Sequence, residues 1–333
     1  MQKIDRRQFL KLGAGTVAAA SLGIRVADAA PMELKFGHVG KPGSLFEKSA
    51  QHFAEVANKR LNGKAKVTVY GASQLGDDME LLQKVKLGTV DFCLPSSVMS
   101  SVVPAFGLFE MPYLVKNRDH MKRIKKAIVW PTLAPQARKR GYEIIAVWEN
   151  GFRQITNNVR PINKPDDLKG IKLRTPKDKW RVKMFEAYGA NPTPMAFSEV
   201  FTALKTHVMD GEENPLVQIY SAKFQEVQKY LSMTDHVYTP AYVVTSPRTW
   251  KGYPDDVRHI LGQAAKDTTA YVYQTAAALD QSLKGKLTAA GMQANDADKK
   301  AFVDASGPIY KQFGQQIEGG EAMIKKAQSL RNA

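Results

Sequence analysis

The histidines and the single cysteine are the residue types most able to bind a metal or attack a substrate, and their spacing indicates neither. The six histidines form no His-Glu-x-x-His or His-x-His pattern and have no partner cysteines, so the sequence predicts no metal site. Cys93 is the only cysteine, which excludes an internal disulfide and a Cys-x-x-Cys redox pair. It lies in a short strand-like run over 90–94, where a free cysteine is expected to be buried. No cofactor is expected from these residues.

Other patterns of catalytic residues are incomplete. Gly-Lys-Ser and Gly-Lys-Thr are absent, which excludes a P-loop, and the segment 71–76 has the wrong spacing for the nucleophile turn of serine hydrolases. Two acidic pairs, Asp77-Asp78 and Glu212-Glu213, stand beside glycine at expected helix or turn boundaries, where capping explains acidic residues. We therefore expect a protein that is not an enzyme.

The first thirty residues have the features of an export signal. The segment 6–11, Arg-Arg-Gln-Phe-Leu-Lys, resembles a twin-arginine signal, although Asp5 stands where such signals usually have Ser or Thr. A weakly apolar stretch over 12–26 and the small-x-small cleavage pattern of 27–29 follow it. The apolar stretch is too short for a membrane-spanning helix. We expect removal of residues 1–30, a periplasmic location, and no stable membrane insertion of the mature chain, with the general export route left open.

The charge balance indicates an anionic partner without identifying it. The chain holds 48 basic and 32 acidic residues, a net charge of +16, and removing the five basic and two acidic residues of 1–30 leaves +13. The densest basic cluster, over 122–126, has the helical spacing of a solvated helix face. No nucleic-acid-binding module accompanies the charge, so nucleic acid is not expected as a partner.

The elements that position any site alternate between strands and helices, which is typical of an α/β fold. The expected elements of the first part are strands over 33–39, 65–70 and around Phe92, and helices over 45–61 and 77–87. This βαβαβ order places helices on both faces of a parallel sheet and opens a crevice at the carboxyl ends of the strands.

The chain is then expected to cross between two lobes. A strand over 142–148 continues past Asn150-Gly151 into 152–156, where the chain leaves the first lobe. A second αβ series follows, and the β-rich segment 238–246 is expected to cross back. A last helical stretch is expected over 298–328.

Residues 254–290 are expected to form one long helix. Small or apolar residues recur with helical spacing over roughly thirty-five residues, so the helix is on the order of 50 Å long, longer than one domain is wide. Such a helix has to span both lobes of a two-lobed clamshell. The expected boundaries are 31–150 plus about 240–279 for lobe I, and 151–239 plus about 280–333 for lobe II.

Six segments in a fixed order carry a family resemblance: 70–78, 87–91, 150–154, 167–176, 194–200 and 210–215. Together they make the mature chain similar to the extracytoplasmic solute-binding subunit of tripartite ATP-independent periplasmic (TRAP) transporters, the DctP-type family. The resemblance implies a periplasmic-binding-protein-like fold, in agreement with the periodicity. It also implies capture of a small organic acid by hinge closure, and delivery to small and large membrane subunits driven by an ion gradient.

Three polar residues match positions of the family's ligand site. The family's arginine in Lys-Leu-Arg-Thr-Pro grips the ligand carboxylate, and that position is Arg174, whose planar guanidinium matches a carboxylate. The alternative is an arginine paired with Asp178 or Glu149. Arg153 matches a second family arginine in the cleft. Asn214 matches an asparagine that can donate to the same carboxylate, with turn capping before the following proline as the alternative.

Five further residues are expected at the ligand site, namely Phe197, Trp148, His38, Ser96 and Ser97. Phe197 and Trp148 would form an apolar wall, with ordinary core packing as the alternative for Trp148. His38 ends the first strand, and Ser96 and Ser97 follow the third, so all three lie where the crevice of lobe I opens.

The ligand class is narrowed but not fixed. Family members that bind sialic acid carry an acidic residue and an arginine at the positions of Ser96 and Met99, so the residues here favour a smaller acid. The candidates are a C4-dicarboxylate, a 2-hydroxy or 2-oxo acid, an aromatic carboxylate and a hexuronate. Two other classes stay open: an exported cofactor-using enzyme, in line with a twin-arginine signal, and a ligand sensor for a receptor kinase.

Overall fold

A computed structural model describes residues 31–332 and begins with the predicted parallel βαβαβ unit. Its elements are β1 (Met32–Gly37), α1 (Leu45–Leu61), β2 (Ala65–Tyr70), α2 (Asp78–Leu87) and β3 (Phe92–Cys93). β1 lies between β2 and β3 and is parallel to both. Asp77 caps α2 by accepting hydrogen bonds from two backbone N–H groups, and Glu80 completes a capping box. The predicted α/β class is confirmed.

Two antiparallel strands complete this first sheet and also connect it to a second sheet. β4 (Glu143–Asn157) pairs with β9 (Tyr238–Thr245) along its first part, and β9 returns to β3. The end of β4 pairs with β7 (Gly211–Pro215) on one side and with β8 (Tyr230–Met233) on the other. The sequence predicted two strand segments separated at 150–151, and the structure joins them in one strand with a bulge there.

The second sheet is built from shorter strands. β5 (Lys172–Thr175) lies between β6 (Asn191–Pro194) and β7, parallel to both, while β8 pairs with β10 (Gln293–Asp296). Its helices are α6 (Lys179–Ala187), α7 (Phe197–Lys205) and α8 (Leu216–Ser221). Glu212 and Glu213 are fully buried in β7, so the expectation that they cap a helix or turn was wrong.

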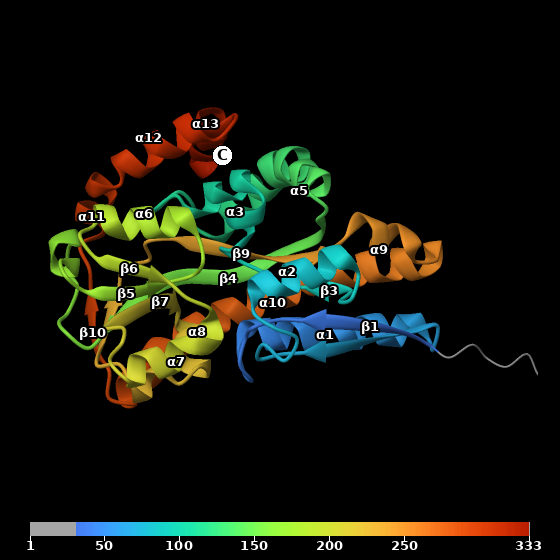
Figure 1. Ribbon diagram of the computed structural model, residues 1–333, viewed down its shortest axis with the longest axis horizontal. Helices are drawn as coiled ribbons and strands as arrows, with labels where there is room; N and C mark the ends of the chain where they lie inside the picture. Colours follow the sequence, from blue (N-terminus) through green and yellow to red (C-terminus); the bar gives the residue numbers. More distant parts are fainter. Residues whose placement is uncertain (1–30, 333) are drawn as a thin grey trace, which may run out of the picture. The chain divides into compact units, whose positions relative to one another are not determined.

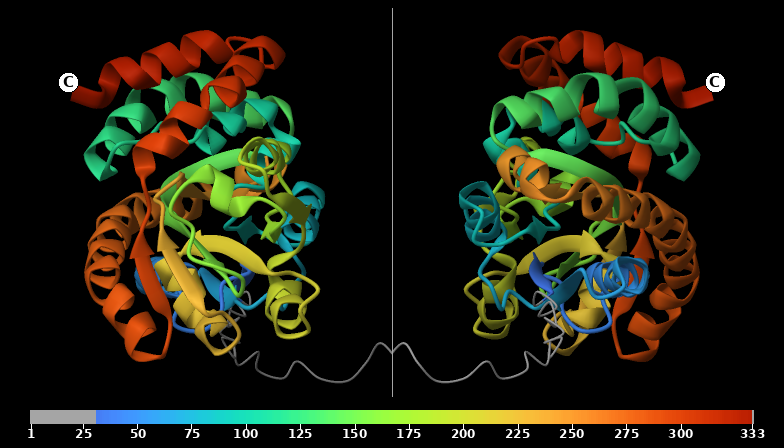
Figure 2. Two further views of the ribbon diagram at one scale, coloured as in Figure 1. Left: turned by 90° about the vertical axis from the view of Figure 1, so that its left-hand side faces the viewer. Right: turned by 90° about the vertical axis from the view of Figure 1, so that its right-hand side faces the viewer.

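The predicted long helix is α10 (Asp255–Ala289), 35 residues in length. It contacts α1 and β4 of the first sheet and α8 and β10 of the second, and it runs beside both sheets (Figures 1 and 2). Ala264 and Ala265 are fully buried on it, and such small side chains let a helix approach its neighbours closely. One helix therefore joins the two sheets.

The remaining helices cover the sheets. Between β3 and β4 lie α3 (Met99–Val102), η1 (Pro104–Glu110), α4 (Arg118–Ile124), η2 (Lys125–Leu133) and α5 (Ala134–Lys139); η3 (Pro165–Leu168), η4 (Phe224–Glu226) and α9 (Pro247–Gly252) follow later. The expected single helical stretch over 298–328 is divided into α11 (Lys299–Ala305), α12 (Gly307–Gln316) and α13 (Gly320–Ser329), followed by η5 (Leu330–Asn332). Pro308 stands in the first turn of α12, where its missing N–H is not needed, and Gly319, with a φ of 69°, separates α12 from α13. No helix within 31–332 is long and apolar enough to cross a membrane.

Candidate functional site

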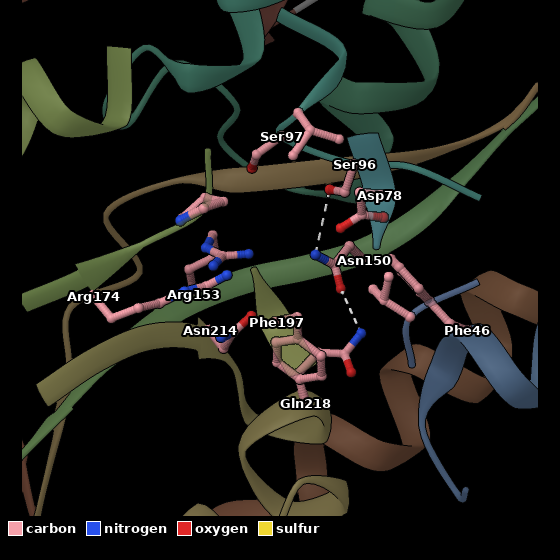
Figure 3. A pocket seen from close by; sticks show the side chains of 13 residues that line it. Phe46, Asp78, Ser96, Ser97, Asn150, Arg153, Arg174, Phe197, Asn214 and Gln218 are labelled. Atoms are coloured by element: carbon pink, nitrogen blue, oxygen red, sulfur yellow. Dashed lines mark hydrogen bonds between the residues drawn. The ribbon is translucent and has the colours of Figure 1, made fainter. Parts of the chain in front are cut away.

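A cavity of about 40 Å³ lies where the two sheets meet at β4 (Figure 3). The loop after β3 contributes to it from the first sheet, and β5, β7 and α7 contribute from the second. Thirteen residues line it: Val39, Phe46, Asp78, Ser96, Ser97, Val98, Asn150, Arg153, Arg174, Pro176, Phe197, Asn214 and Gln218. Six of the eight sequence-predicted residues are therefore brought together, namely Arg174, Arg153, Asn214, Phe197, Ser96 and Ser97.

Arg174 is buried at the cavity without a carboxylate partner. Its Nε and Nη2 atoms donate to the Met195 carbonyl oxygen at 3.0 and 2.6 Å, and its guanidinium carbon lies 6.0 Å from the centre of the Phe197 ring. No carboxylate of residues 31–332 lies within 4.0 Å of it: Asp178 caps α6, and Glu149 pairs with Arg118. Burial, and then the nearby Arg153, lower the pKa of Arg174 to about 10, so it stays charged at neutral pH.

Arg153, in contrast, has its charge compensated. Its Nε donates to Glu213 Oε2 at 2.5 Å and its Nη2 to Glu213 Oε1 at 3.0 Å. Arg181 Nη1 and His236 Nε2 also lie 2.6 and 3.0 Å from Glu213 Oε2. Burial alone would raise the pKa of Glu213, but Arg153 and Arg181 hold it well below its usual range. Glu213 is thus ionised and fixes Arg153 at the cavity wall.

Asn214 lies beside a second buried acid. Its Nδ2 donates to Glu212 Oε2 at 2.5 Å, and Thr156 Oγ1 donates to Glu212 Oε1 at 2.9 Å. Burial raises the pKa of Glu212 to about 7, although the Asn214 hydrogen bond opposes the rise. A side-chain amide carries two N–H donors, so Asn214 retains one besides that bond. The position is a buried strand rather than a capped turn.

Three polar residues of the cavity were not predicted. Asn150 and Gln218 are hydrogen-bonded to each other at 3.2 Å, and Asn150 Nδ2 also reaches Ser96 Oγ at 3.3 Å (Figure 3). Asp78 is the third. Asp78 ends one segment of the family resemblance and Asn150 begins another, and this is the sequence signal by which both could have been found. Gln218 lies outside those segments on α8, and only its burial in the folded chain marks it.

Asp78 faces the cavity as the first residue of α2. Burial, and then the adjacent Asp77, raise the pKa of Asp78 to about 7, while Arg174 and Lys177 oppose the rise. Its carboxyl group accepts no hydrogen bond from residues 31–332. In the same range, no group of three or more His, Cys, Asp or Glu residues is placed to hold a metal ion.

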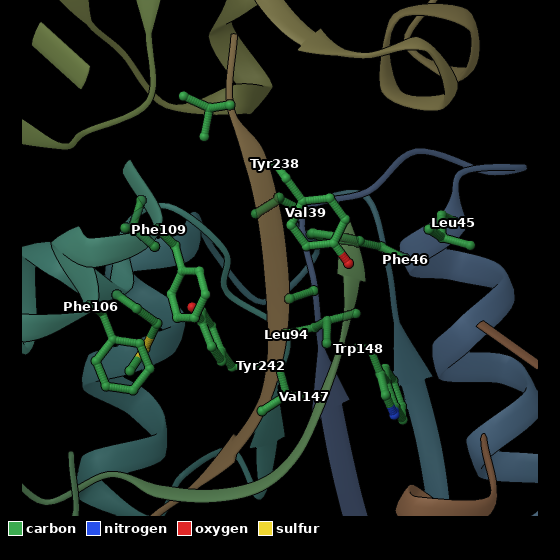
Figure 4. Packing of buried hydrophobic residues seen from close by; sticks show 14 of the residues in the cluster. Val39, Leu45, Phe46, Leu94, Phe106, Phe109, Val147, Trp148, Tyr238 and Tyr242 are labelled. Atoms are coloured by element: carbon green, nitrogen blue, oxygen red, sulfur yellow. The ribbon is translucent and has the colours of Figure 1, made fainter. Parts of the chain in front are cut away.

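Two predicted residues lie away from the cavity lining. Trp148 is fully buried in the core, with its ring centre 6.3 Å from that of Phe36, and its Nε1 donates to the Ala265 carbonyl at 3.0 Å (Figure 4). The core-packing alternative describes its position, and the expected wall is formed without it. His38 is also fully buried, with Nε2 3.0 Å from Glu47 Oε2, and its ring centre lies 6.5 Å from that of Phe46, which lines the cavity.

The chain matches known proteins over most of its length. The model of a family described as bacterial extracellular solute-binding protein, family 7, matches residues 36–316. A model of the twin-arginine signal matches residues 3–23, which confirms the predicted signal and its periplasmic address; these residues lie outside those that the structure describes.

Relatives and solved structures agree with that match. The 2,3-diketo-L-gulonate-binding periplasmic protein of Escherichia coli is 31% identical over 299 residues, 89% of this chain and 91% of the relative. The C4-dicarboxylate-binding periplasmic protein of Rhodobacter capsulatus is 33% identical over 93% of this chain and 95% of its own. TRAP periplasmic solute-binding proteins of a Polaromonas species, bound to D-erythronate, and of Sulfurospirillum deleyianum, with bound succinate, both superpose with a TM-score of 0.86. Their sequences are 31% and 34% identical to this one. Each superposition covers 90% of this chain, and 98% and 99%, respectively, of the solved structures.

Proposed function

Because the chain belongs to family 7 of the bacterial extracellular solute-binding proteins, we propose that its mature form captures a small organic acid in the periplasm and delivers it to a TRAP transporter. Members of this family are binding proteins rather than enzymes. The compounds bound by the relatives and solved structures described above are all carboxylates. This shared chemistry supports a carboxylate ligand here.

The uncompensated charge of Arg174 is the observation that carries the proposal. The Met195 carbonyl occupies the Nε side of the guanidinium and fixes its plane. The edge formed by Nη1 and the second N–H of Nη2 stays available, and this edge matches the two oxygens of a carboxylate. A buried cation without a counter-ion is costly, so a ligand carboxylate that pairs with it gains more than it would in water.

Capture proceeds by closure of two lobes around the ligand. We assign 31–150 plus about 240–279 to lobe I, and 151–239 plus about 280–333 to lobe II. The crossings by β4, β9 and α10 support this division, because few segments have to bend when the lobes rotate. Closure expels water and strengthens the ion pair at Arg174.

The closed, loaded protein then docks on the transporter. We propose a small and a large integral membrane subunit as its partners, as in the family it belongs to. The net charge of +13 on the mature chain raises the local concentration of organic anions, an effect that salt weakens.

Substitution of Arg174 tests the proposal. A thermal-shift screen of small carboxylates first identifies a ligand, since any tight ligand raises the melting temperature. Arg174→Lys keeps the charge and loses the planar fork, so we expect binding of that ligand to weaken by about 1.5–3 kcal/mol, or roughly ten- to a hundredfold, in calorimetric titrations.

Arg248→Lys is the matched control, because Arg248 is exposed on α9 and does not line the cavity. Its affinity for the ligand should equal that of the unmodified chain. Equal affinities for all three proteins would remove Arg174 from the binding site.

A further inference from the structure

The two sides of the cavity differ in chemistry. Arg153 and Arg174 lie on one side, while Asp78, Ser96 and Gln218 lie on the other (Figure 3). The guanidinium side offers N–H donors to an anion. The opposite side offers oxygen atoms, and the hydrogen bonds of its residues decide which of these oxygens are left for a ligand.

A chain of hydrogen bonds fixes the orientation of Gln218. The Pro240 carbonyl can only accept, so the Ser96 hydroxyl donates to it, at 2.7 Å. Ser96 Oγ must then accept from Asn150 Nδ2, which leaves Asn150 Oδ1 to accept from Gln218 Nε2. Gln218 Oε1 is therefore a buried acceptor that no group within residues 31–332 satisfies. A group brought to this oxygen has to carry an O–H or N–H donor.

Asp78 likewise offers acceptor oxygens that require a hydrogen-bond donor on the ligand. Its carboxyl group faces the cavity and accepts no hydrogen bond from the described residues. Arg174 and Arg153 are the basic residues that line the cavity, and Arg153 is already paired with Glu213. The cavity thus holds one uncompensated cation and, across from it, one carboxyl group with free acceptors.

This arrangement favours one ligand class over another. A ligand with one carboxylate and several hydroxyl groups can pair with Arg174 and donate to both Asp78 and Gln218. The second carboxylate of a dicarboxylate would lie against Asp78 with no further unpaired cation of the lining to meet it. Above the pKa of Asp78, which is about 7, both groups are negatively charged, and like charges at such a position disfavour binding.

Building on the proposed function, we infer that the ligand is a hydroxylated monocarboxylate, whose carboxylate binds Arg174 and whose hydroxyl groups donate to Asp78 and to Gln218 Oε1. Asp78 and Gln218 then determine specificity, and dicarboxylates are discriminated against.

Four-carbon acids that differ in their hydroxyl groups and in the presence of a second carboxylate test this inference. The exported chain, without its signal, is titrated calorimetrically with D-erythronate, butyrate and succinate, and with glycerate and gluconate as shorter and longer hydroxy acids. We expect at least one hydroxy acid to bind about tenfold or more tightly than butyrate and succinate. Succinate binding as tightly as the best hydroxy acid would overturn the inference and leave the proposed function standing. If none of these acids and no other carboxylate binds, the proposed function itself fails.

Variants of the two acceptors separate their roles. At pH 8.5, above the Asp78 pKa of about 7, Asp78→Asn removes the charge that faces a second carboxylate, so the ratio of the succinate Kd to the hydroxy-acid Kd should fall about tenfold or more. Gln218→Met removes the acceptor at similar side-chain length and should weaken hydroxy-acid binding about tenfold without weakening butyrate binding.

Glu80→Gln is the control, because it makes the same charge change on an exposed position of the same helix. Its Kd ratio should match that of the unmodified chain. Equal ratios for Asp78→Asn and Glu80→Gln, or an unchanged hydroxy-acid affinity of Gln218→Met, would overturn the inference. Circular dichroism and melting curves check that each variant folds. If either Asp78→Asn or Gln218→Met fails to fold, the result for the remaining variant decides.

Discussion

Three buried arginines meet near the cavity, and their different partners explain their different roles. Arg181 lies between Glu110 and Glu213, and Arg153 forms two hydrogen bonds with the Glu213 carboxylate. Removing one partner of such a buried pair is strongly destabilising, because a charge is left unpaired. These two arginines therefore belong to the scaffold as much as to the site. Among the three, Arg174 alone is bonded to a neutral carbonyl and to no carboxylate, which leaves its charge for a ligand.

Glu212 is predicted to make the folded protein less stable as the pH rises. Its pKa rises on folding from 4.5 to about 7, so between these values the folded state binds more protons than the unfolded state. The contribution of Glu212 to stability is full below about pH 4.5 and is lost as pH rises through 7. Glu212→Gln cannot titrate, so we expect nearly equal melting temperatures near pH 4 and a more stable variant at pH 8.5, by roughly 2–4 kcal/mol.

Melting curves of the unliganded protein across this pH range provide the measurement. The difference between variant and unmodified chain is the relevant quantity, because other groups titrate equally in both. Parallel curves would show that the pKa of Glu212 is not raised on folding.

The sequence identified the arginines of the site, but it did not identify all the other residues that line the cavity. Arg174 and Arg153 were found through family segments, yet only the fold shows that Glu213 compensates one and not the other. Trp148 could not be placed, because alternation along a strand separates two faces without telling which one meets the cavity. Gln218 carries no pattern at all, since its role depends on a hydrogen bond to Asn150, 68 residues away in the chain.

Among the elements, β4 is the one on which both sheets depend. It pairs with β9 in the first sheet and with β7 and β8 in the second, and the bulge at Gly151 marks the change. Gly151 has a φ of 126°, in a region that side chains rarely adopt. A Cβ atom there would lie 3.3 Å from Pro215 Cβ of the neighbouring strand.

Alanine at this bulge should therefore be costly. We expect Gly151→Ala to lower the free energy of unfolding by about 1–3 kcal/mol, measured by denaturant titration. Gly252→Ala, at the end of α9, has no atom within 4 Å of the new Cβ and should be neutral or slightly stabilising. Equal stability of the two variants would mean that the bulge has no conformational requirement for glycine.

Long, regularly patterned elements were predictable, and short ones were not. The bounds of α1 and β2 and the extent of α10 followed from periodicity and caps, because many residues contribute to each pattern. β6, β7, β8 and β10 have four or five residues each, too few to show alternation. Their pairing is decided by partners distant in sequence, which composition does not report.

At the scale of the whole chain, the crossings by β4, β9 and α10 limit how the proposed lobes can move. Beyond these crossings, Lys177 Nζ pairs with Asp77 at 2.9 Å, and the Ser101 hydroxyl donates to the Lys177 carbonyl at 2.7 Å. These bonds join the N-cap of α2 and the helix α3, beside the first sheet, to the segment that follows β5 of the second sheet. Contacts of this kind can form only when the two sides are close together.

Small-angle scattering tests the closure. Addition of a saturating ligand should lower the radius of gyration of the exported chain, because the ligand binds both sides of the cavity and favours the closed state. The Arg174→Lys variant at the same ligand concentration should show a smaller decrease. Identical scattering of free and fully loaded protein would contradict a large rotation of the lobes.

Cys93 lies at the meeting point of β3 and β9, opposite Val244, with its thiol fully buried. Burial also raises the pKa of this thiol well above its usual range, so the reactive thiolate is scarce while the strands stay paired. A thiol reagent can modify the chain only in the moments when this strand pair separates. Because the sequence has no other cysteine, the rate at which the reagent modifies the chain reports the local opening of the β3–β9 strand pair, and no added label is needed.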